Sequence, residues 1–301
     1  MSQLLKREFS NKPKDFLKEE EFVSLLYHDI FDYPLTSQEL IKWRIGEKAP
    51  SLDKERTPNI VLRGGYYFLR GREGLILKRT LREKTSKGKF LIAQKAASII
   101  GLIPSVKMVA VTGALCMENC QEEADVDLMI ITRKGALWTS RILVYLLLKF
   151  LRIPTREPKD KNQKNKLCLN MWLDEADLIW RKRNIFTAHE IAQIVLLVNK
   201  DKTYERFIGK NSWIADYWPN SVKIRNPKSE IRKDSFVLRA SCFVLKLFEP
   251  FARKLQFVYM KKRITSETLT PTRALFHPVD WGKYVSLKLK YKVYASSALA
   301  E

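Results

Sequence analysis

The chain has 301 residues, of which 46% are hydrophobic, so it is long enough for two or three domains with buried cores and is not a disordered polymer. Lysine and arginine number 55 against 33 acidic residues, which gives a formal charge of +22. This excess favours polyanionic partners, namely nucleic acid, nucleotides or an anionic membrane surface.

No targeting or membrane segment is predicted. Residues 1–16 are polar and lack the apolar run of a signal peptide. The longest apolar run, residues 142–151, is interrupted by Lys149 and is too short to span a bilayer. The four cysteines are expected to be small buried residues of a protein in the reducing cytosol: Cys116, Cys120, Cys168 and Cys242. A soluble, cytoplasmic protein is therefore predicted, and a membrane is not the expected partner.

The first predicted domain covers residues 1–86. Apolar residues from Phe22 to Ile30 have helical spacing, and Thr36 with Glu39 forms the capping box of a second short helix. Residues 60–69 predict two strands around a Gly-Gly turn. Two helices followed by a hairpin resemble a winged helix-turn-helix domain, whose third helix is expected within residues 50–58.

A second domain is predicted over residues 87–200. Residues 84–89 are typical of a linker or a helix start, and an apolar helix is expected to follow over residues 93–100. An apolar strand then runs to a turn at Gly113, where the missing Cβ lets the backbone approach a ligand closely. The residues after this turn, 114–119, are expected to open a helix whose free N–H groups face a phosphate.

Asp125 and Asp127 stand two residues apart at the start of the next apolar run. Side chains alternate across a strand, so the two carboxylates share one face while Val126 and Leu128 point into the core. Paired carboxylates suit Mg²⁺, which completes its shell with water and substrate phosphates.

Strand, glycine turn, spacer and Asp-x-Asp pair together resemble the DNA polymerase β-like nucleotidyltransferase superfamily. Gly113, Asp125 and Asp127 match its motif, whereas Ala114 stands where that family has serine. The resemblance implies two Mg²⁺ ions on the aspartates and a nucleoside triphosphate donor. A third carboxylate is expected on the strand of residues 167–173, where Asn170 takes the central polar position and alternation groups it with Cys168 and Trp172.

The remaining segments carry weaker signals. Residues 136–151 predict a core helix, and residues 152–166 predict a basic surface loop. Thr187 is interpreted as the N-cap of a helix through Val198, with Glu190 in its capping box and His189 on its surface. A third region, residues 201–301, is predicted to be basic and helical, with amphipathic helices over residues 235–260.

The predicted architecture is α+β: a nucleotidyltransferase-type mixed sheet between a winged-helix-like module and a helical extension. The predicted function is Mg²⁺-dependent transfer of a nucleoside monophosphate from a nucleoside triphosphate to a hydroxyl acceptor. One alternative, favoured by Ala114 and Asn170, is a catalytically inactive scaffold that acts as a nucleic-acid-binding regulator. Another is association of residues 235–262 with an anionic membrane.

Overall fold

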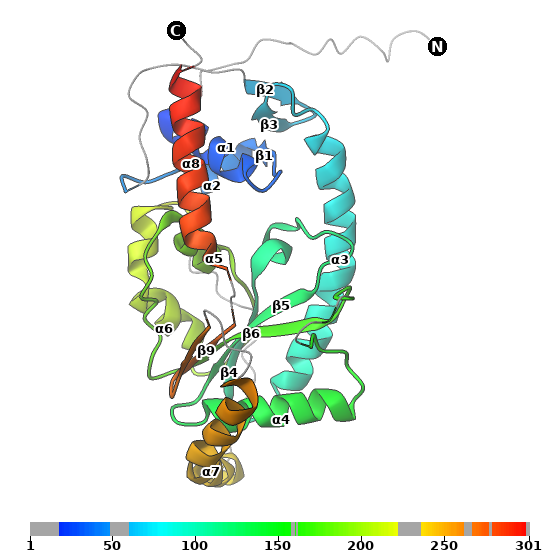
Figure 1. Cartoon of the computed structure of the whole chain (residues 1–301), viewed down its shortest axis with the longest axis vertical. Coiled ribbons are helices and arrows are strands. Elements are labelled where there is room, and N and C mark those ends of the chain that lie inside the picture. Colours follow the sequence, from blue (N-terminus) through cyan, green and yellow to red (C-terminus); the bar gives the residue numbers. More distant parts are fainter. Residues whose placement is uncertain are drawn as a thin grey trace.

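The structure is a computed structural model that describes residues 18–48, 60–157, 160, 162–221, 236–261, 267–276 and 279–298, with backbone only at 236–244 and 297–298. It has an α+β architecture with two sheets (Figure 1). The smaller sheet has the strand order β1-β3-β2, and the larger one has the order β7-β4-β5-β6-β9-β8.

The smaller sheet and two helices form an N-terminal unit. Its elements are α1 (Glu19–Asp29), β1 (Leu35–Thr36), α2 (Ser37–Lys42), β2 (Ile60–Arg63) and β3 (Tyr66–Leu69). The capping box of Thr36 and Glu39 is confirmed at the start of α2. The hairpin turns at Gly64 and Gly65, whose φ values are +60° and +82°. The third helix expected within residues 50–58 lies outside the described residues.

Helix α3 (Leu75–Ile100) connects the N-terminal unit to the larger sheet and runs along the whole side of the molecule (Figure 1). The linker or helix start expected at residues 84–89 is wrong, because these residues lie in the middle of α3. The helix expected over residues 93–100 is confirmed as the end of α3, but the part before it was missed because its buried face is mostly polar, with Arg79, Arg82, Ser86 and Lys89.

The larger sheet has one parallel strand pair, β5 with β6, and its other neighbours are antiparallel. Its strands are β4 (Val106–Val111), β5 (Val126–Thr132), β6 (Leu167–Asp174), β7 (Val195–Asn199), β8 (Thr268–Thr270) and β9 (Arg273–Leu275). Two strands of the region after residue 200 thus complete the sheet that begins in the region before it.

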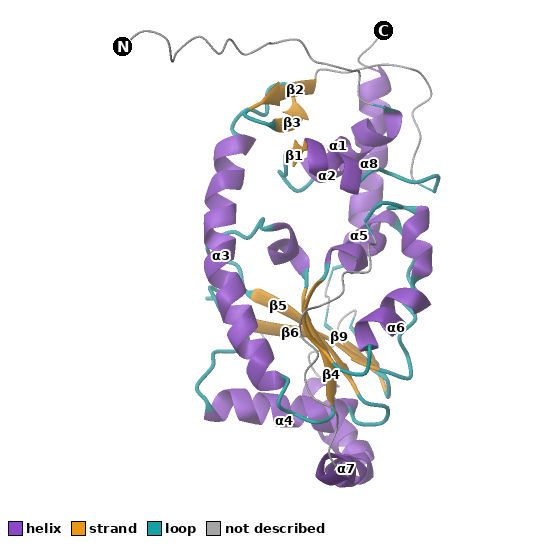
Figure 2. Ribbon diagram, turned by 180° about the vertical axis from the view of Figure 1, so that it is seen from behind, coloured by secondary structure: helices purple, strands orange, loops and turns teal. Residues whose placement is uncertain are grey.

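Helices cover both faces of this sheet (Figure 2). One face packs in a core with α3, α4 (Leu137–Phe150) and α7 (Phe236–Met260). The other packs with α1, α5 (Ile185–Gln193), α6 (Thr203–Lys210) and α8 (Trp281–Ala298), together with the short helix η2 (Ser212–Asp216). Helix α8 returns to the N-terminal unit, where Lys292 Nζ pairs with Asp29 Oδ2 at 2.5 Å.

Strand β6 carries an irregularity that changes its facing pattern. Asp127 pairs with Cys168, whereas Met129 pairs with Met171, so two residues of β6 oppose one residue of β5. The extra residue moves Trp172 to the face of α3 and α4. The prediction that Trp172 shares a face with Cys168 and Asn170 is therefore wrong, because strict alternation does not allow for a bulge.

Helix α5 differs from the prediction at both ends. Its N-cap is Asn184, whose Oδ1 accepts from the Thr187 N–H at 2.9 Å. The helix ends at Gln193, and the apolar residues that follow form β7. His189 is buried at 4% exposure, so its predicted surface position is also wrong. The error arose because periodicity alone does not distinguish a short apolar run after a helix from a continuation of that helix.

Within the part of the chain that the structure describes, no helix combines the length and apolar character needed to cross a membrane.

Candidate functional site

The two aspartates lie at the start of β5. Asp125 precedes the strand and Asp127 is its second residue, while Val126 and Leu128 are fully buried as predicted. Alternation places Asp127 on the same face as Met129, whose side chain belongs to the core shared with α5. The Asp127 side chain therefore points into the space between the sheet and α5.

Asp127 is held by β6. The Asn170 Nδ2 group donates to its Oδ1 at 2.7 Å, and Cys168, its partner in the strand register, hydrogen-bonds to the same carboxylate. Burial and the neighbouring charge of Asp125 raise the pKa of Asp127 to about 7. The site therefore concentrates negative charge that a cation could stabilise.

Gly113 packs directly against this carboxylate. Its φ is +67°, and a Cβ built at this position would lie 2.9 Å from Asp127 Oδ2. The Thr112 N–H also donates to the Asp127 carbonyl oxygen at 3.1 Å. Only glycine allows both the left-handed backbone and this close approach. The turn then continues as the short 3₁₀ helix η1 (Gly113–Met117), with Ala114 exposed, in place of the helix expected over residues 114–119.

Asp125 is paired with a cation of the protein. Arg156, in the basic loop before β6, donates from Nη1 to Asp125 Oδ2 at 2.9 Å and reaches Cys168 Sγ at 3.8 Å. The guanidinium thus neutralises part of the charge of the aspartate pair. Its contribution was missed because the loop sequence does not show which of its basic residues reaches the strand.

The ligand atoms available for a metal come from both strands. One atom each of Asp125, Asp127 and Cys168 lies within 4.8 Å of the others. Asn170 Oδ1 is buried and has no hydrogen-bond partner among the described residues. Two carboxylates and a free amide oxygen fit the oxygen ligation that Mg²⁺ prefers, and the Cys168 sulfur adds a softer donor. A cation bound here must compete with Arg156 for Asp125.

A third carboxylate reaches the site from α5 and not from β6. Glu190 is bridged to the glycine turn by Gln193, whose Nε2 donates to Glu190 Oε1 at 2.5 Å and to the Gly113 carbonyl at 3.3 Å. Burial and the charge of Asp127 raise the pKa of Glu190 to about 8. The sequence predicts Glu190 in the capping box of a helix. The signal for its place in the site is an acidic residue among apolar neighbours, because a charged group in such a segment needs a specific partner.

Lys89 fixes the loop that leads into Asp125. Its side chain is buried, and its Nζ donates to the carbonyls of Glu122 and Ala124 and to Asn165 Oδ1, at 2.9, 2.6 and 2.9 Å. The Lys89 ammonium group therefore connects α3 to the loops that precede β5 and β6. We assign Lys89 a positioning role.

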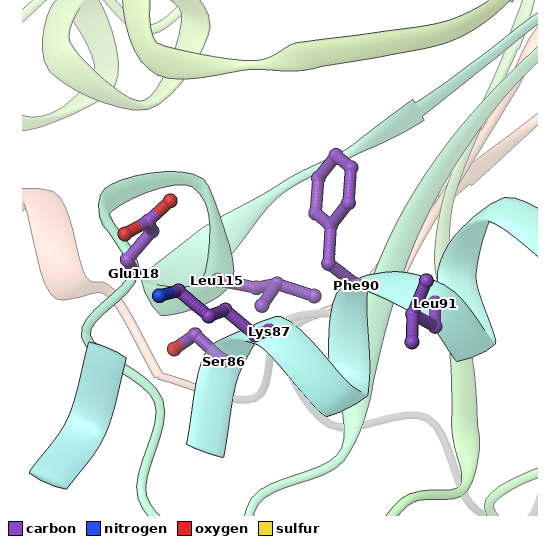
Figure 3. A pocket seen from close by; sticks show the side chains of 6 residues that line it. All are labelled: Ser86, Lys87, Phe90, Leu91, Leu115 and Glu118. Carbon is purple, nitrogen blue, oxygen red and sulfur yellow. The ribbon is translucent and has the colours of Figure 1, made fainter. Parts of the chain in front are cut away.

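A cavity of about 280 Å³ lies beside η1, between it and α3 (Figure 3). Ser86, Lys87, Phe90 and Leu91 line it from α3, while Leu115 and Glu118 line it from the η1 segment. Leu115 belongs to the core on the α3 face of the sheet, whereas Asp127 points to the α5 face. The cavity is therefore not included in the candidate site.

Comparison of the chain with protein-family models, curated proteins and solved structures finds no match. The function is therefore inferred from the geometry around Asp125 and Asp127.

Proposed function

We propose that this protein is a Mg²⁺-dependent nucleotidyltransferase that transfers a nucleoside monophosphate from a nucleoside triphosphate to a hydroxyl acceptor. The observation that carries this proposal is the packing of Gly113, in a left-handed conformation, against the Asp127 carboxylate, with Asp125 beside it. The chain resembles the nucleotidyltransferase superfamily in three parts: a strand, a glycine turn and a following strand that carries the paired aspartates.

Asp125 and Asp127 would hold Mg²⁺, with the Asn170 amide oxygen close by. The metal supplies charge neutralisation and alignment of the phosphates with the attacking hydroxyl. Gly113 and the exposed Ala114 let the triphosphate approach the backbone of the turn without a side chain in the way. Arg156 would move from Asp125 to a phosphate, because guanidinium groups bind phosphate and carboxylate oxygens alike.

We assign the acceptor side of the reaction to Glu190. Glu190 is half-buried and its charge interacts with that of Asp127, and its raised pKa makes it a stronger proton acceptor than an exposed glutamate. Glu190 would accept the proton of the attacking hydroxyl. The resemblance placed the base on β6, at the position of Asn170. An amide is not a base near neutral pH, so Glu190 takes this role in place of Asn170.

The N-terminal unit supports a more limited proposal. Its order of α1, β1, α2 and the β2-β3 hairpin, with β1 pairing to β3, supports a winged-helix-like module whose expected third helix lies outside the described residues. Arg63 at the end of β2 and Arg70 directly after β3 are exposed and are available for phosphate contacts. We propose that the unit orients the acceptor rather than reading a DNA sequence.

Titration calorimetry with ATP, CTP, GTP and UTP in the presence of Mg²⁺ tests the proposal. The wild type is expected to bind at least one nucleotide in a Mg²⁺-dependent way, and Asp125→Asn/Asp127→Asn is expected to lose this binding while keeping its thermal unfolding transition. No nucleotide binding by folded wild-type protein, or equal binding by both proteins, would contradict it.

A second candidate function is a catalytically inactive scaffold that binds nucleic acid. It is favoured by the ion pair between Arg156 and Asp125, together with Asn170 in place of an acid. This candidate predicts that binding to duplex DNA or RNA weakens steeply with salt, because bound lysines and arginines release counterions. Salt-independent or absent binding argues against it.

A further inference from the structure

Helix α7 presents three different faces over residues 245–260, where its side chains are described. One face packs against α4 through Ala252, Gln256 and Met260, which are all buried. The Gln256 Nε2 group donates to the Trp138 carbonyl at 2.8 Å, and Glu249 accepts from the Trp138 N–H at 2.7 Å. These contacts fix the rotation of α7 and therefore determine which side chains point outward.

The second face is apolar and open to solvent. At about 100° per residue its members fall within an arc of about 120°. They are between 54% and 66% exposed: Leu247, Phe248, Phe251, Leu255, Val258 and Tyr259. A continuous apolar surface of this kind is uncommon on a soluble monomer and marks an interaction site.

The third face is basic. By the same geometry Lys246, Arg253 and Lys254, with Lys261 directly after the helix, occupy an adjoining arc of about 100° that they share with Pro250 and Phe257. Residues 137–152 and 245–261 together hold seven basic residues and a single acid, Glu249. That acid is committed to α4, where it accepts from the backbone N–H groups of Trp138 and Thr139.

We propose that α7 docks on an anionic lipid bilayer, with its apolar arc at the boundary between headgroups and acyl chains and its basic arc among the headgroup phosphates. Basic amphipathic helices with exposed aromatic and aliphatic residues bind membranes in this way. The inference does not depend on the proposed nucleotidyl transfer.

The charge pattern favours lipid over a second copy of this chain. Two copies meeting through α7 would bring two basic arcs together, and Glu249, the acid that residues 137–152 and 245–261 hold, is already bonded to α4. Nucleic acid would satisfy the basic arc but leave the apolar arc in water. Helix α7 also lies at the end of the molecule opposite the N-terminal unit, which leaves room for a flat surface beneath it (Figures 1 and 2).

Co-sedimentation of the full chain with phosphatidylcholine vesicles, with and without phosphatidylglycerol, tests the inference. The variant is Phe251→Ser/Leu255→Ser, which removes apolar surface and keeps the net charge. The matched control is Leu77→Ser/Leu91→Ser, because these leucines of α3 are each 67% exposed and lie away from α7. Wild type and control are expected to bind phosphatidylglycerol vesicles, and the α7 variant is expected to bind them about ten-fold or more weakly.

Three results would overturn the inference. Undiminished binding by the α7 variant would mean that the general positive charge attracts the protein and that α7 does not insert. Failure of the folded wild type to bind would exclude docking on lipid. Concentration-dependent self-association that the α7 variant loses, without vesicle binding, would mean that the apolar arc binds a second copy of the chain.

A separate Arg253→Gln/Lys254→Gln variant is expected to lose the preference for phosphatidylglycerol.

Discussion

Gly113 combines two constraints that can be separated by mutation. Its left-handed φ of +67° penalises any side chain, and its Cβ position lies 2.9 Å from Asp127 Oδ2. Gly65 has a similar φ of +82° but no atom within 4 Å of its Cβ position. Gly65→Ala therefore measures the backbone penalty alone, at about 1–2 kcal/mol.

Gly113→Ala is expected to lower the free energy of unfolding by more than Gly65→Ala does, because Asp127 must also move. It is also expected to abolish Mg²⁺-dependent nucleotide binding, which Gly65→Ala should keep. Urea unfolding and calorimetry of the two variants provide the comparison. Normal nucleotide binding by Gly113→Ala would show that close approach of the turn to Asp127 is not needed.

Glu190 is expected to act in transfer and not in nucleotide binding. Glu190→Gln keeps the side-chain shape and removes the proton acceptor, so transfer should fall by about 10²- to 10⁴-fold. Stability should not fall, since burial penalises the ionised carboxylate, as its raised pKa of about 8 indicates. Single-turnover kinetics and nucleotide titrations separate the two roles. A parallel loss of nucleotide binding would make Glu190 a positioning residue.

The sequence predicted the site residues that lie close together along the chain and missed those that folding brings next to them. Asp125, Asp127 and Gly113 belong to one strand-turn-strand segment, so their spacing carries the information. Glu190, Arg156 and Cys168 reach the same carboxylates from other elements. No spacing in the chain encodes such contacts, which depend on the order of strands in the sheet.

Helix α3 stabilises the site through Lys89. Lys89→Met keeps the aliphatic stem but leaves three oxygen acceptors without their donor, at a cost of about 1–3 kcal/mol. Lys95→Met, on an exposed position of the same helix, is the control and should cost little. Thermal unfolding measures both. Equal stability of the two variants would contradict the assigned role of Lys89.

Helices α1 and α5 meet at two buried histidines. His28 Nδ1 bonds to the Ser24 carbonyl at 2.8 Å, so this nitrogen carries the proton. His28 Nε2 therefore accepts from His189 Nε2 at 3.3 Å, and both rings are neutral. Burial lowers the pKa of His28 from 6.5 to about 4 and lowers that of His189 well below its ordinary value.

Acid should destabilise this contact. Between pH 6.5 and 4 the unfolded chain binds more protons than the folded chain, so stability falls as pH falls through this range. From neutral pH to pH 5, His28 alone should cost about 2 kcal/mol. Urea unfolding at both pH values, for wild type and for His28→Gln/His189→Gln, isolates the effect. The variant should lose less stability on acidification, and an identical loss would show that the histidines do not contribute.

Strands with a clear apolar pattern or turn glycines were predictable from the sequence, whereas the part of α3 with a polar buried face was not. The β2-β3 hairpin and the β4 and β5 strands have turn glycines or continuous apolar runs. Helix α3 buries two arginines and a lysine that are satisfied by residues distant in sequence, such as Glu39 for Arg79. Polar partners of this kind cannot be recognised before the fold is known.

At the scale of the molecule, the region after residue 200 contributes both to the larger sheet and to the core of the N-terminal unit. Strands β8 and β9 extend the sheet beyond β6, and α8 packs between α1 and α5. Val285, Leu289 and Val293 on α8 join the same core as the N-terminal unit. Composition shifts along the chain could not reveal this return, because β8 and β9 are short and α8 is rich in lysine.

The proposed nucleotidyl transfer depends on whether Asp125 and Asp127 hold a divalent cation together with a nucleotide. The most direct measurement is electron paramagnetic resonance of Mn²⁺, a stand-in for Mg²⁺ with the same preference for oxygen ligands, in the presence of a non-hydrolysable nucleoside triphosphate. Wild type should bind Mn²⁺ more tightly with the nucleotide than without it, and Asp125→Asn/Asp127→Asn should not. Equal Mn²⁺ binding by the two proteins would place the metal elsewhere and contradict the proposed site.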